Sequence, residues 1–227
     1  MAASRVGGGQ PTGLMAFWAN VDTGYRERFS DWHNTEHMCE RVAIPGFVAG
    51  RRYVAMSDSP YYFMMYETEG PEVLRSDAYM AALNNPTPWT RESLQQFRDP
   101  VRNIYQLVKN HGASDFARSP CMITMRFNAA RPVPRDEDWR RLMAEWGETR
   151  LRHYEINTEI SGIQTSEKKI YGSIPAGQKH LLLIELDLPQ ARSADGSEAK
   201  VREFAMGYAD TFVDRYRIDY HLERSPA

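Results

Sequence analysis

The sequence predicts an α+β protein made of two successive β-α-β-β-α-β units. Short apolar runs of strand length alternate with longer segments in which apolar residues recur every three or four positions. The same order of elements occurs twice along the chain. A stretch rich in breaker residues, 110–120, separates the two copies. The 227 residues, 42% of them hydrophobic, are enough for one large domain or two small ones.

Charge and composition narrow the range of partners. Lys and Arg total 28 against 30 Asp and Glu, with no run of five like charges, so we expect no nucleic-acid partner. No apolar stretch approaches the roughly 18–20 residues that span a bilayer, and residues 1–13 lack the apolar core of a signal peptide. Cys39 and Cys121 belong to no CxxC pair. These features predict a cytoplasmic protein with reduced thiols and no membrane association.

The first unit follows a leader, residues 1–12, that we expect to be disordered. The predicted elements are a strand over 14–21, a helix over 24–43, strands over 50–57 and 61–68, helices over 71–83 and 89–97, and a strand over 101–109. Pro45 and Gly46 are typical of a helix end, and Asp58-Ser59-Pro60 is typical of a hairpin turn.

The second unit is predicted to repeat this order. Its elements are a strand over 122–127, a helix over 136–155, strands over 162–172 and 180–188, a helix over 198–216 and a strand over 218–223. The order predicts two ferredoxin-like repeats, 13–110 and 119–227, joined by a linker over 111–118. Each antiparallel sheet has helices on one face only, so we expect the two other faces to pack together as a pseudo-dimer within the chain.

One segment carries a family resemblance. Residues 29–53, Phe-Ser-Asp-Trp-His-Asn-Thr-Glu-His through Pro-Gly-Phe to Arg-Arg-Tyr, resemble a signature of the dimeric α/β-barrel superfamily, on its EthD-like side. The stretch from Tyr79 to Asn85-Pro-Thr-Pro-Trp-Thr90 is similar too. The resemblance covers 14–109 and reaches the second half only through the repeated order. It implies two ferredoxin-like units whose sheets join into a barrel. Members include lactone isomerases, polyketide cyclases, decarboxylases, dehydrochlorinases and heme-dependent monooxygenases, so it implies a small-molecule site without naming the reaction.

His33, Glu36 and His37 form the sharpest candidate site. Positions i and i+4 share one helix face, and imidazole titrates near neutral pH, as general acid–base catalysis requires. The alternative is that the three side chains lie at the helix surface or bond to nearby backbone. In the second repeat, Gly147, Arg150 and Leu151 would occupy the equivalent positions, so we expect one such site in the chain.

The same residues read His-x-x-Glu-His, the inverted zincin order. A zinc site of that kind needs a third ligand from a later helix, and here strands are predicted to follow. Glu40 or Glu67 could supply further ligands to another divalent metal. We therefore expect no bound metal and no other cofactor. Heme remains an alternative because either histidine could be an axial ligand.

Several strand residues are candidates for substrate binding. Arg51 and Arg52 are adjacent, so one can face inward and hold a carboxylate, although solvated arginines are the commoner case. Asp219 and His221 alternate with apolar residues in the last strand, where polar side chains can also simply be solvated. Aromatic residues would add an apolar wall suited to an aromatic substrate. The candidate binding residues are Trp18, Arg51, Arg52, Tyr53, Trp89, Asp219 and His221.

These residues favour a cofactor-independent isomerase, cyclase, decarboxylase or other lyase of aromatic catabolism or secondary metabolism. It would transfer protons on an apolar or aromatic carbonyl compound in a barrel pocket. His37 or His33 would be the base, at the barrel mouth, and Glu36 would face inward beside Trp32 and pair with His37. The alternatives are a non-catalytic ligand-binding or stress-related barrel and a metal- or heme-dependent oxygenase. The expected partner is a small molecule, with a homodimer possible.

Overall fold

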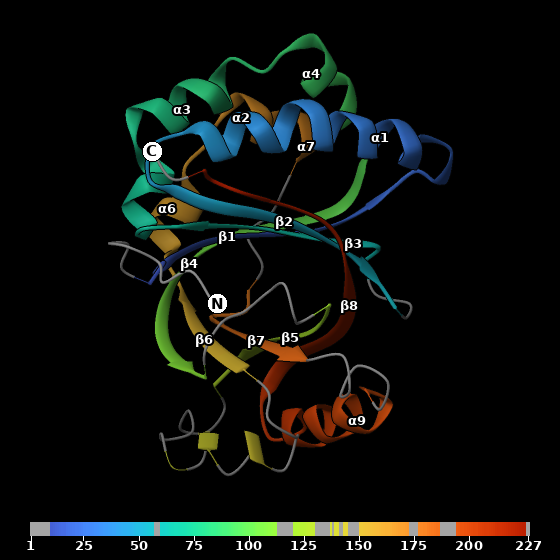
Figure 1. Cartoon of the computed structure of the whole chain (residues 1–227), viewed down its shortest axis with the longest axis vertical. Helices are drawn as coiled ribbons and strands as arrows, with labels where there is room; N and C mark the ends of the chain where they lie inside the picture. Colours follow the sequence, from blue (N-terminus) through green and yellow to red (C-terminus); the bar gives the residue numbers. More distant parts are fainter. Residues whose placement is uncertain are drawn as a thin grey trace.

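The computed structural model describes residues 10–56, 60–112, 120–129, 137, 139–140, 143–144, 150–172, 177–186 and 194–225. Eight antiparallel strands close into a barrel in the order β1-β3-β2-β8-β5-β7-β6-β4 (Figure 1). The strands are β1 (Gly13–Val21), β2 (Phe47–Ala55), β3 (Tyr62–Thr68), β4 (Phe97–His111), β5 (Cys121–Asn128), β6 (Arg150–Ile156), β7 (His180–Leu186) and β8 (Ala209–Glu223). The protein is therefore an α+β barrel, as the sequence predicts at this level.

Helices of three kinds connect the strands. The α-helices are α1 (Arg26–Trp32), α2 (Met38–Ala43), α3 (Asp77–Asn84), α4 (Pro88–Leu94), α6 (Thr158–Gly162), α7 (Ser166–Tyr171) and α9 (Ala194–Ala205). The 3₁₀ segments are η1 (Thr23–Tyr25) and η3 (Pro71–Arg75), and η2 (His33–His37) is a π-helical turn between α1 and α2. Helices α1 to α4 and α7 gather over one side of the barrel, whereas α9 lies at its other end (Figure 1). No described helix is both long and apolar enough to cross a membrane.

Each half of the chain contributes four neighbouring strands to the barrel. Strands β4-β1-β3-β2 come from the first half and β8-β5-β7-β6 from the second, and the pairs β2–β8 and β4–β6 close the ring. Alternation along each strand sends one set of side chains into the barrel and the other under the helices. The result is one core inside the barrel and one under the helices of each half.

The barrel interior is filled rather than hollow around its middle. Apolar and aromatic side chains pack there, including Trp18, Tyr53 and Phe63. A buried ionic network lies beside them, in which Glu67 accepts hydrogen bonds from Arg51 and Arg152. The substrate pocket that we expected inside the barrel is therefore not supported among the described residues, because side chains from all eight strands occupy that space.

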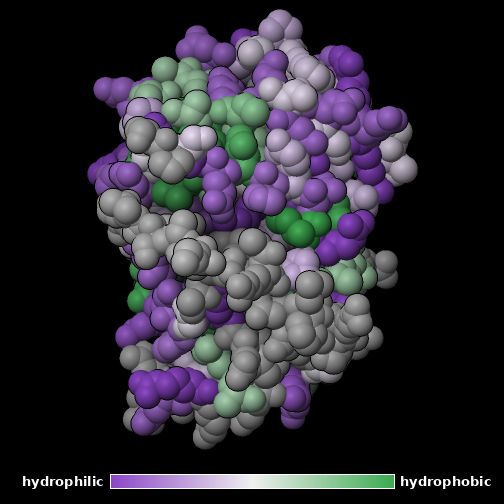
Figure 2. All heavy atoms as spheres, viewed as in Figure 1, coloured by the Kyte–Doolittle hydropathy of each residue, from purple (hydrophilic) through white to green (hydrophobic). Residues whose placement is uncertain are grey.

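The outer surface shows no large apolar face in the view of Figure 2. Hydrophilic residues cover most of the upper part, and the hydrophobic areas there are small and separate. Among the described residues, the large hydrophobic side chains that are exposed are Met56, Val108, Met206 and Phe212. A homodimer therefore remains a proposal.

The predicted elements of the first half are confirmed, with shifted boundaries. The helix predicted over 71–83 divides into η3 and α3, because Ser76 caps a new helix by accepting the Tyr79 backbone N–H. The predicted leader, 1–12, and linker, 111–118, lie mostly outside the described residues.

The helix predicted over 136–155 is wrong in its second part. Residues 137, 139–140 and 143–144 are helical, but Arg150–Ile156 form β6, which pairs with β4 on one side and β7 on the other. The three- and four-residue apolar spacing ends at Trp146, and extending the helix from there to Leu151 overlooked a step of five residues. In β6, pairing with two neighbouring strands outweighs local helix preference. Arg150 and Leu151 therefore do not occupy helix positions equivalent to the first-half trio, and Gly147 lies outside the described residues.

The strand predicted over 162–172 is also wrong, because this segment contains the end of α6 and all of α7. Asn157 caps α6 through the Ile160 N–H, and Thr165 caps α7 through the Lys168 N–H. Gly172, at φ +68°, ends α7 in the left-handed conformation.

The helix predicted over 198–216 ends early, at Ala205, and residues from Ala209 onward belong to β8. The strand predicted over 218–223 is only the end of β8. This strand pairs with β5 and β2, so it spans the joint between the two halves.

Candidate functional site

A cavity lies between the helices of the first half and the outer face of the sheet beneath them. The sheet contributes side chains from β1, β3 and β4, the turn η2 contributes both histidines, and α7 from the second half closes it. Its free volume is about 30 Å³, which suits water-sized groups. A larger ligand therefore enters only if side chains or α7 move.

The turn η2 positions His33 and His37 in this cavity. The Met38 N–H bonds to the carbonyl of His33, five residues back, and such π-turns are frequent at functional sites. The two imidazole centroids are 5.7 Å apart, and both side chains are buried. The ring of Trp32 packs 4.4 Å from that of His37. The helix face that carries the histidines is thus its buried face, and it does not lie at a barrel mouth as expected.

Tyr66 holds one side of His33. Its hydroxyl lies 3.3 Å from His33 Nε2, close enough for a hydrogen bond whose direction depends on the imidazole tautomer. Gly50 on the neighbouring strand makes room for this arrangement. A Cβ at Gly50 would lie 2.9 Å from Met38 Cγ and 3.0 Å from Tyr66 Cε1, so a larger residue would push the ring and the helix apart.

Both histidines are neutral at pH 7. Burial lowers the pKa of His33 well below its usual value, and the nearby charges of Arg52 and Arg41 lower it further. Burial likewise lowers the pKa of His37, with Arg41 and His33 adding to the shift. Neither Nδ1 atom has a hydrogen-bond partner among the described residues. Because unpartnered buried polar atoms cost free energy, these two nitrogens are candidates to receive a ligand.

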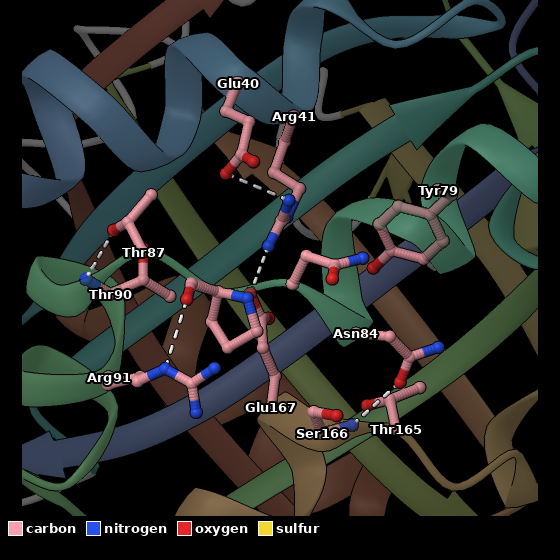
Figure 3. Close-up of polar contacts among 12 residues, drawn as sticks. Glu40, Arg41, Tyr79, Asn84, Thr87, Thr90, Arg91, Thr165, Ser166 and Glu167 are labelled. Atoms are coloured by element: carbon pink, nitrogen blue, oxygen red, sulfur yellow. Dashed lines mark hydrogen bonds and ion pairs between the residues drawn. The ribbon is translucent and has the colours of Figure 1, made fainter.

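Charged groups line the same cavity. Arg41 binds Glu167 on α7 in a buried ion pair, and Glu40 lies 3.1 Å from the other guanidinium nitrogen (Figure 3). Arg102 donates to the Tyr79 hydroxyl at 3.1 Å. Burial raises the pKa of Glu167, and Arg41 opposes that shift. Two guanidinium groups face one carboxylate among the lining residues, which favours an anionic or polarisable ligand.

Sequence reasoning missed Glu167, because its segment was assigned to a strand. The cap at Thr165 and the Asn84 side chain, which accepts the Ser166 N–H at 3.0 Å, place α7 over the cavity (Figure 3). A Thr followed by helix-forming residues and a terminal Gly is a helix signature, so Thr165 and Gly172 were the signals available in the sequence.

Glu36 does not face the cavity as expected. Its Oε1 accepts hydrogen bonds from the hydroxyls of Thr87, at 2.6 Å, and Thr90, at 3.0 Å, both at the start of α4. Thr90 in turn accepts from the indole N–H of Trp32 at 3.1 Å. Glu36 thus fixes α1 and η2 against α4. These hydrogen bonds to Thr87 and Thr90 replace the pairing with His37 that we expected.

The predicted binding residues are divided among three places. Trp18, Tyr53 and Arg51 lie inside the barrel, away from the histidines. Arg52 is buried on the outer face, where it donates to Asp219 at 2.7 Å, so one of the two adjacent arginines faces inward as expected. Trp89 is half-buried on α4, and Asp219 and His221 are exposed. Neither Asp219 nor His221 belongs to the cavity.

Heme does not fit these residues as they are arranged. The rings of Phe17, Phe97 and Tyr171 pack at 4.9 to 6.1 Å and fill one end of the cavity. A drug-sized ligand already needs roughly 300 Å³ or more, far above the free volume here, and a porphyrin is larger still. We therefore derive no step through heme.

Comparisons with known proteins bear on the fold. No family model and no curated protein sequence matches the chain. Among solved structures, an anthrone oxidase-like protein matches with a TM-score of 0.59 and 5% identity, over 96% of this chain and 95% of the other. This chain has the dimeric α+β-barrel fold.

Two more structures support this conclusion. A candidate monooxygenase from Lactobacillus acidophilus matches with a TM-score of 0.52 and 8% identity, over 95% of this chain and 97% of the other. Another candidate monooxygenase, from Fusobacterium nucleatum subsp. nucleatum, matches with a TM-score of 0.51 and 7% identity, over 96% of this chain and 98% of the other. At sequence identities this low, the similarity between these structures and this chain shows a shared fold and nothing more.

Proposed function

We propose that this protein is an oxygenase of small aromatic carbonyl compounds that works by proton abstraction in the cavity beneath α1, η2 and α2. Because the free volume there is about 30 Å³, the substrate enters by displacing α7 and the lining side chains. The observation that carries the proposal is the pair of buried, neutral imidazoles, His33 and His37. Neither Nδ1 has a hydrogen-bond partner among the described residues, and Arg41 and Arg102 line the same cavity. A neutral imidazole is a proton acceptor, and a nearby cation stabilises the anion that proton removal creates.

Each side chain has a distinct role in this proposal. Nδ1 of His37 or His33 takes the proton from an activated C–H or O–H group. Arg41 and Arg102 stabilise the resulting enolate or phenolate oxygen, and Glu167 holds Arg41 in place. The imidazolium that forms is costly in this buried site, so the substrate anion beside it offsets the cost. Glu36 is a positioning residue, because it acts on the site only through Thr90 and Trp32.

The oxidation step needs no further group on the protein if the substrate anion is electron-rich. For an anthrone, the ring CH₂ loses a proton and the carbanion gives its electrons to O₂. The CH₂ then becomes C=O, and one O₂ yields one quinone oxygen and one water. The names of the structural neighbours, an anthrone oxidase-like protein and two candidate monooxygenases, favour this oxidation over the lyase or isomerase chemistry that we expected from the sequence.

The test measures O₂ uptake with anthrone and 1,8-dihydroxyanthrone as probes, corrected for their spontaneous oxidation. We expect catalysed uptake with one quinone formed per O₂. His37→Ala and His33→Ala should each lower the rate by about a hundredfold, the usual scale for a general base. His221→Ala, an exposed histidine outside the cavity, is the matched control. Uptake no faster than the blank, or full activity in both variants, would overturn the proposal.

A second experiment distinguishes oxidation of the substrate from proton transfer alone. Isotope exchange of the anthrone CH₂ with D₂O under nitrogen reports proton abstraction without O₂. Exchange with no O₂ uptake would indicate the isomerase or lyase chemistry instead.

We also propose the finer organisation. Two fused ferredoxin-like repeats, 13–110 and 119–227, would account for the strand orders β4-β1-β3-β2 and β8-β5-β7-β6, which match position by position. An EthD-like origin, a homodimer and a cytoplasmic location belong to the same proposal.

A further inference from the structure

A second cluster of histidines lies on the opposite half of the molecule. His153 and Glu155 are two residues apart on β6, so both point to the same outer face of the sheet. His180, at the start of β7, is directly opposite Glu155 in the strand register. Three side chains with metal-binding atoms therefore converge at one end of this pair of strands.

The distances within this cluster suit a metal ion. His153 Nε2 lies 3.1 Å from His180 Nδ1, and His180 Nδ1 lies 3.8 Å from Glu155 Oε1. All three ligand atoms are within 4.8 Å of one another. Ligands at about 2.0–2.2 Å from one ion are roughly 3 to 3.5 Å apart, so a small rotation of the Glu155 side chain completes the set. That carboxylate is 54% exposed and can rotate.

The packing around the imidazoles holds them in place. Phe127 stacks on His180 at a centroid distance of 5.0 Å and on His153 at 6.4 Å. The Trp139 ring lies 6.1 Å from that of His153. An aromatic wall that fixes both rings lowers the entropy lost when they bind an ion.

The surrounding charges permit a cation. Glu155 is the carboxylate that lies beside His180, and the neighbouring Lys179 is exposed, so its charge is screened by solvent. Lys109 is opposite His153 in the β4–β6 register and is also exposed.

We propose that His153, Glu155 and His180 form a binding site for a divalent transition-metal ion, with at least one coordination position open to water or a small ligand. Two imidazoles and one carboxylate suit Zn²⁺, Co²⁺ or Fe²⁺, and three protein ligands leave the remaining positions open. The site is separate from the cavity of His33 and His37, whose lining contains none of these residues.

The test titrates the metal-free full-length protein with Zn²⁺ by calorimetry and with Co²⁺ by visible absorption. We expect one ion per chain, a Kd below about 10 µM and cobalt bands of a four- or five-coordinate site. His153→Ala and His180→Ala should abolish binding. Glu155→Gln, an exposed change that spares the fold, should weaken it at least tenfold. His221→Ala should bind as the wild type does.

Two results would overturn the proposal. One is binding weaker than about 100 µM in the wild type, which would mean that His153 and His180 only hydrogen-bond to each other. The other is equal Zn²⁺ affinity in wild type and Glu155→Gln, with no Zn²⁺-induced rise in Tm in either protein. In that case the ion binds elsewhere on the surface. Tm without metal checks that each variant is folded.

Discussion

Each half of the barrel has a pair of histidines on its outer face, but the two pairs are built differently. His33 and His37 come from a π-turn and reach down onto the sheet, where Arg41 lies beside them. His153 and His180 come from strands β6 and β7 themselves, and Glu155 lies beside them near the end of β6. The same frame thus places a guanidinium group next to one pair and a carboxylate next to the other.

The sign of that neighbouring charge decides what each pair can do. A guanidinium group disfavours a bound cation and stabilises an anion, so the first pair suits proton removal from a substrate that becomes negative. A carboxylate disfavours an anion and adds a ligand for a cation, so the second pair suits a metal. On these proposals, the two imidazole pairs would differ in function because their charged neighbours differ: Arg41 and Arg102 line the first site, and Glu155 lies beside the second.

The largest expected effect comes from the ionic network that joins the two halves. Glu67 binds Arg51 of its own half and Arg152 of the other, all three buried. Burial raises the pKa of Glu67, but the two guanidinium groups outweigh it and the net pKa is lowered. Glu67→Ala leaves two buried cations without this partner and should cost about 3–5 kcal/mol in urea unfolding.

Glu223→Ala is the matched control for that change. Glu223 also contacts Arg51, at 3.2 Å, but its carboxylate is 52% exposed. Its loss should cost less than about 1 kcal/mol. Equal effects of the two substitutions would mean that burial does not determine how much each ion pair contributes to the free energy of unfolding.

A double dissociation tests the comparison directly. His37→Ala should lower O₂ uptake about a hundredfold and leave Zn²⁺ affinity unchanged. His153→Ala should abolish Zn²⁺ binding and leave O₂ uptake within twofold of the wild type. Loss of both functions in either variant would show that the two histidine pairs form one coupled site.

The pH dependence of stability should show the buried histidines. A histidine whose pKa is lowered on folding binds fewer protons in the folded state, so stability is full above the unfolded pKa of 6.5 and falls below it. Each such histidine adds a slope of up to about 1.4 kcal/mol per pH unit. Burial and His180 lower the pKa of His153 to about 4, so it contributes between pH 6.5 and 4.

Urea unfolding from pH 7.5 to 5 measures this slope. His37→Gln should reduce the slope of unfolding free energy against pH by the contribution of one histidine. The exposed-site variant His221→Ala should show the wild-type slope. An unchanged slope in His37→Gln would mean that His37 is protonated in the folded protein.

The barrel fold could be predicted because its evidence is local and repeated. The strand and helix patterns of the first half are regular, and the segment from Phe29 to Tyr53 carried a family resemblance. The prediction for the second half was wrong because the helical spacing that ends at Trp146 was extended to Leu151, which lies in strand β6. As a helix, 136–155 would place His153 and Glu155 on different faces. Strand β6 places them on one face, so this group of potential metal ligands could not be predicted from the sequence.

The sequence could predict that His33 and His37 lie close together, but it could not predict their surroundings. His33 and His37 share a buried face, as their spacing indicates. Their neighbours Arg102 and Glu167 are 69 and 134 residues from His33 in the chain and are brought there only by folding. Which side of a helix faces a core depends on partners such as Thr87 and Thr90, and these turned Glu36 away from the histidines.

The smallest effect is expected from Glu36→Gln, which can be compared with the same substitution at Glu155, the glutamate beside the other histidine pair. Glu36 uses one oxygen to accept from Thr87 and Thr90, and a glutamine amide oxygen can accept both bonds. Glu36→Gln should therefore lower O₂ uptake less than about threefold and change stability by less than about 1 kcal/mol. Glu155→Gln, the same change in the other half, should weaken Zn²⁺ binding at least tenfold, because an amide is a poorer ligand than a carboxylate. A hundredfold loss of turnover in Glu36→Gln would contradict this structural role and restore Glu36 and His37 as a catalytic acid–base pair.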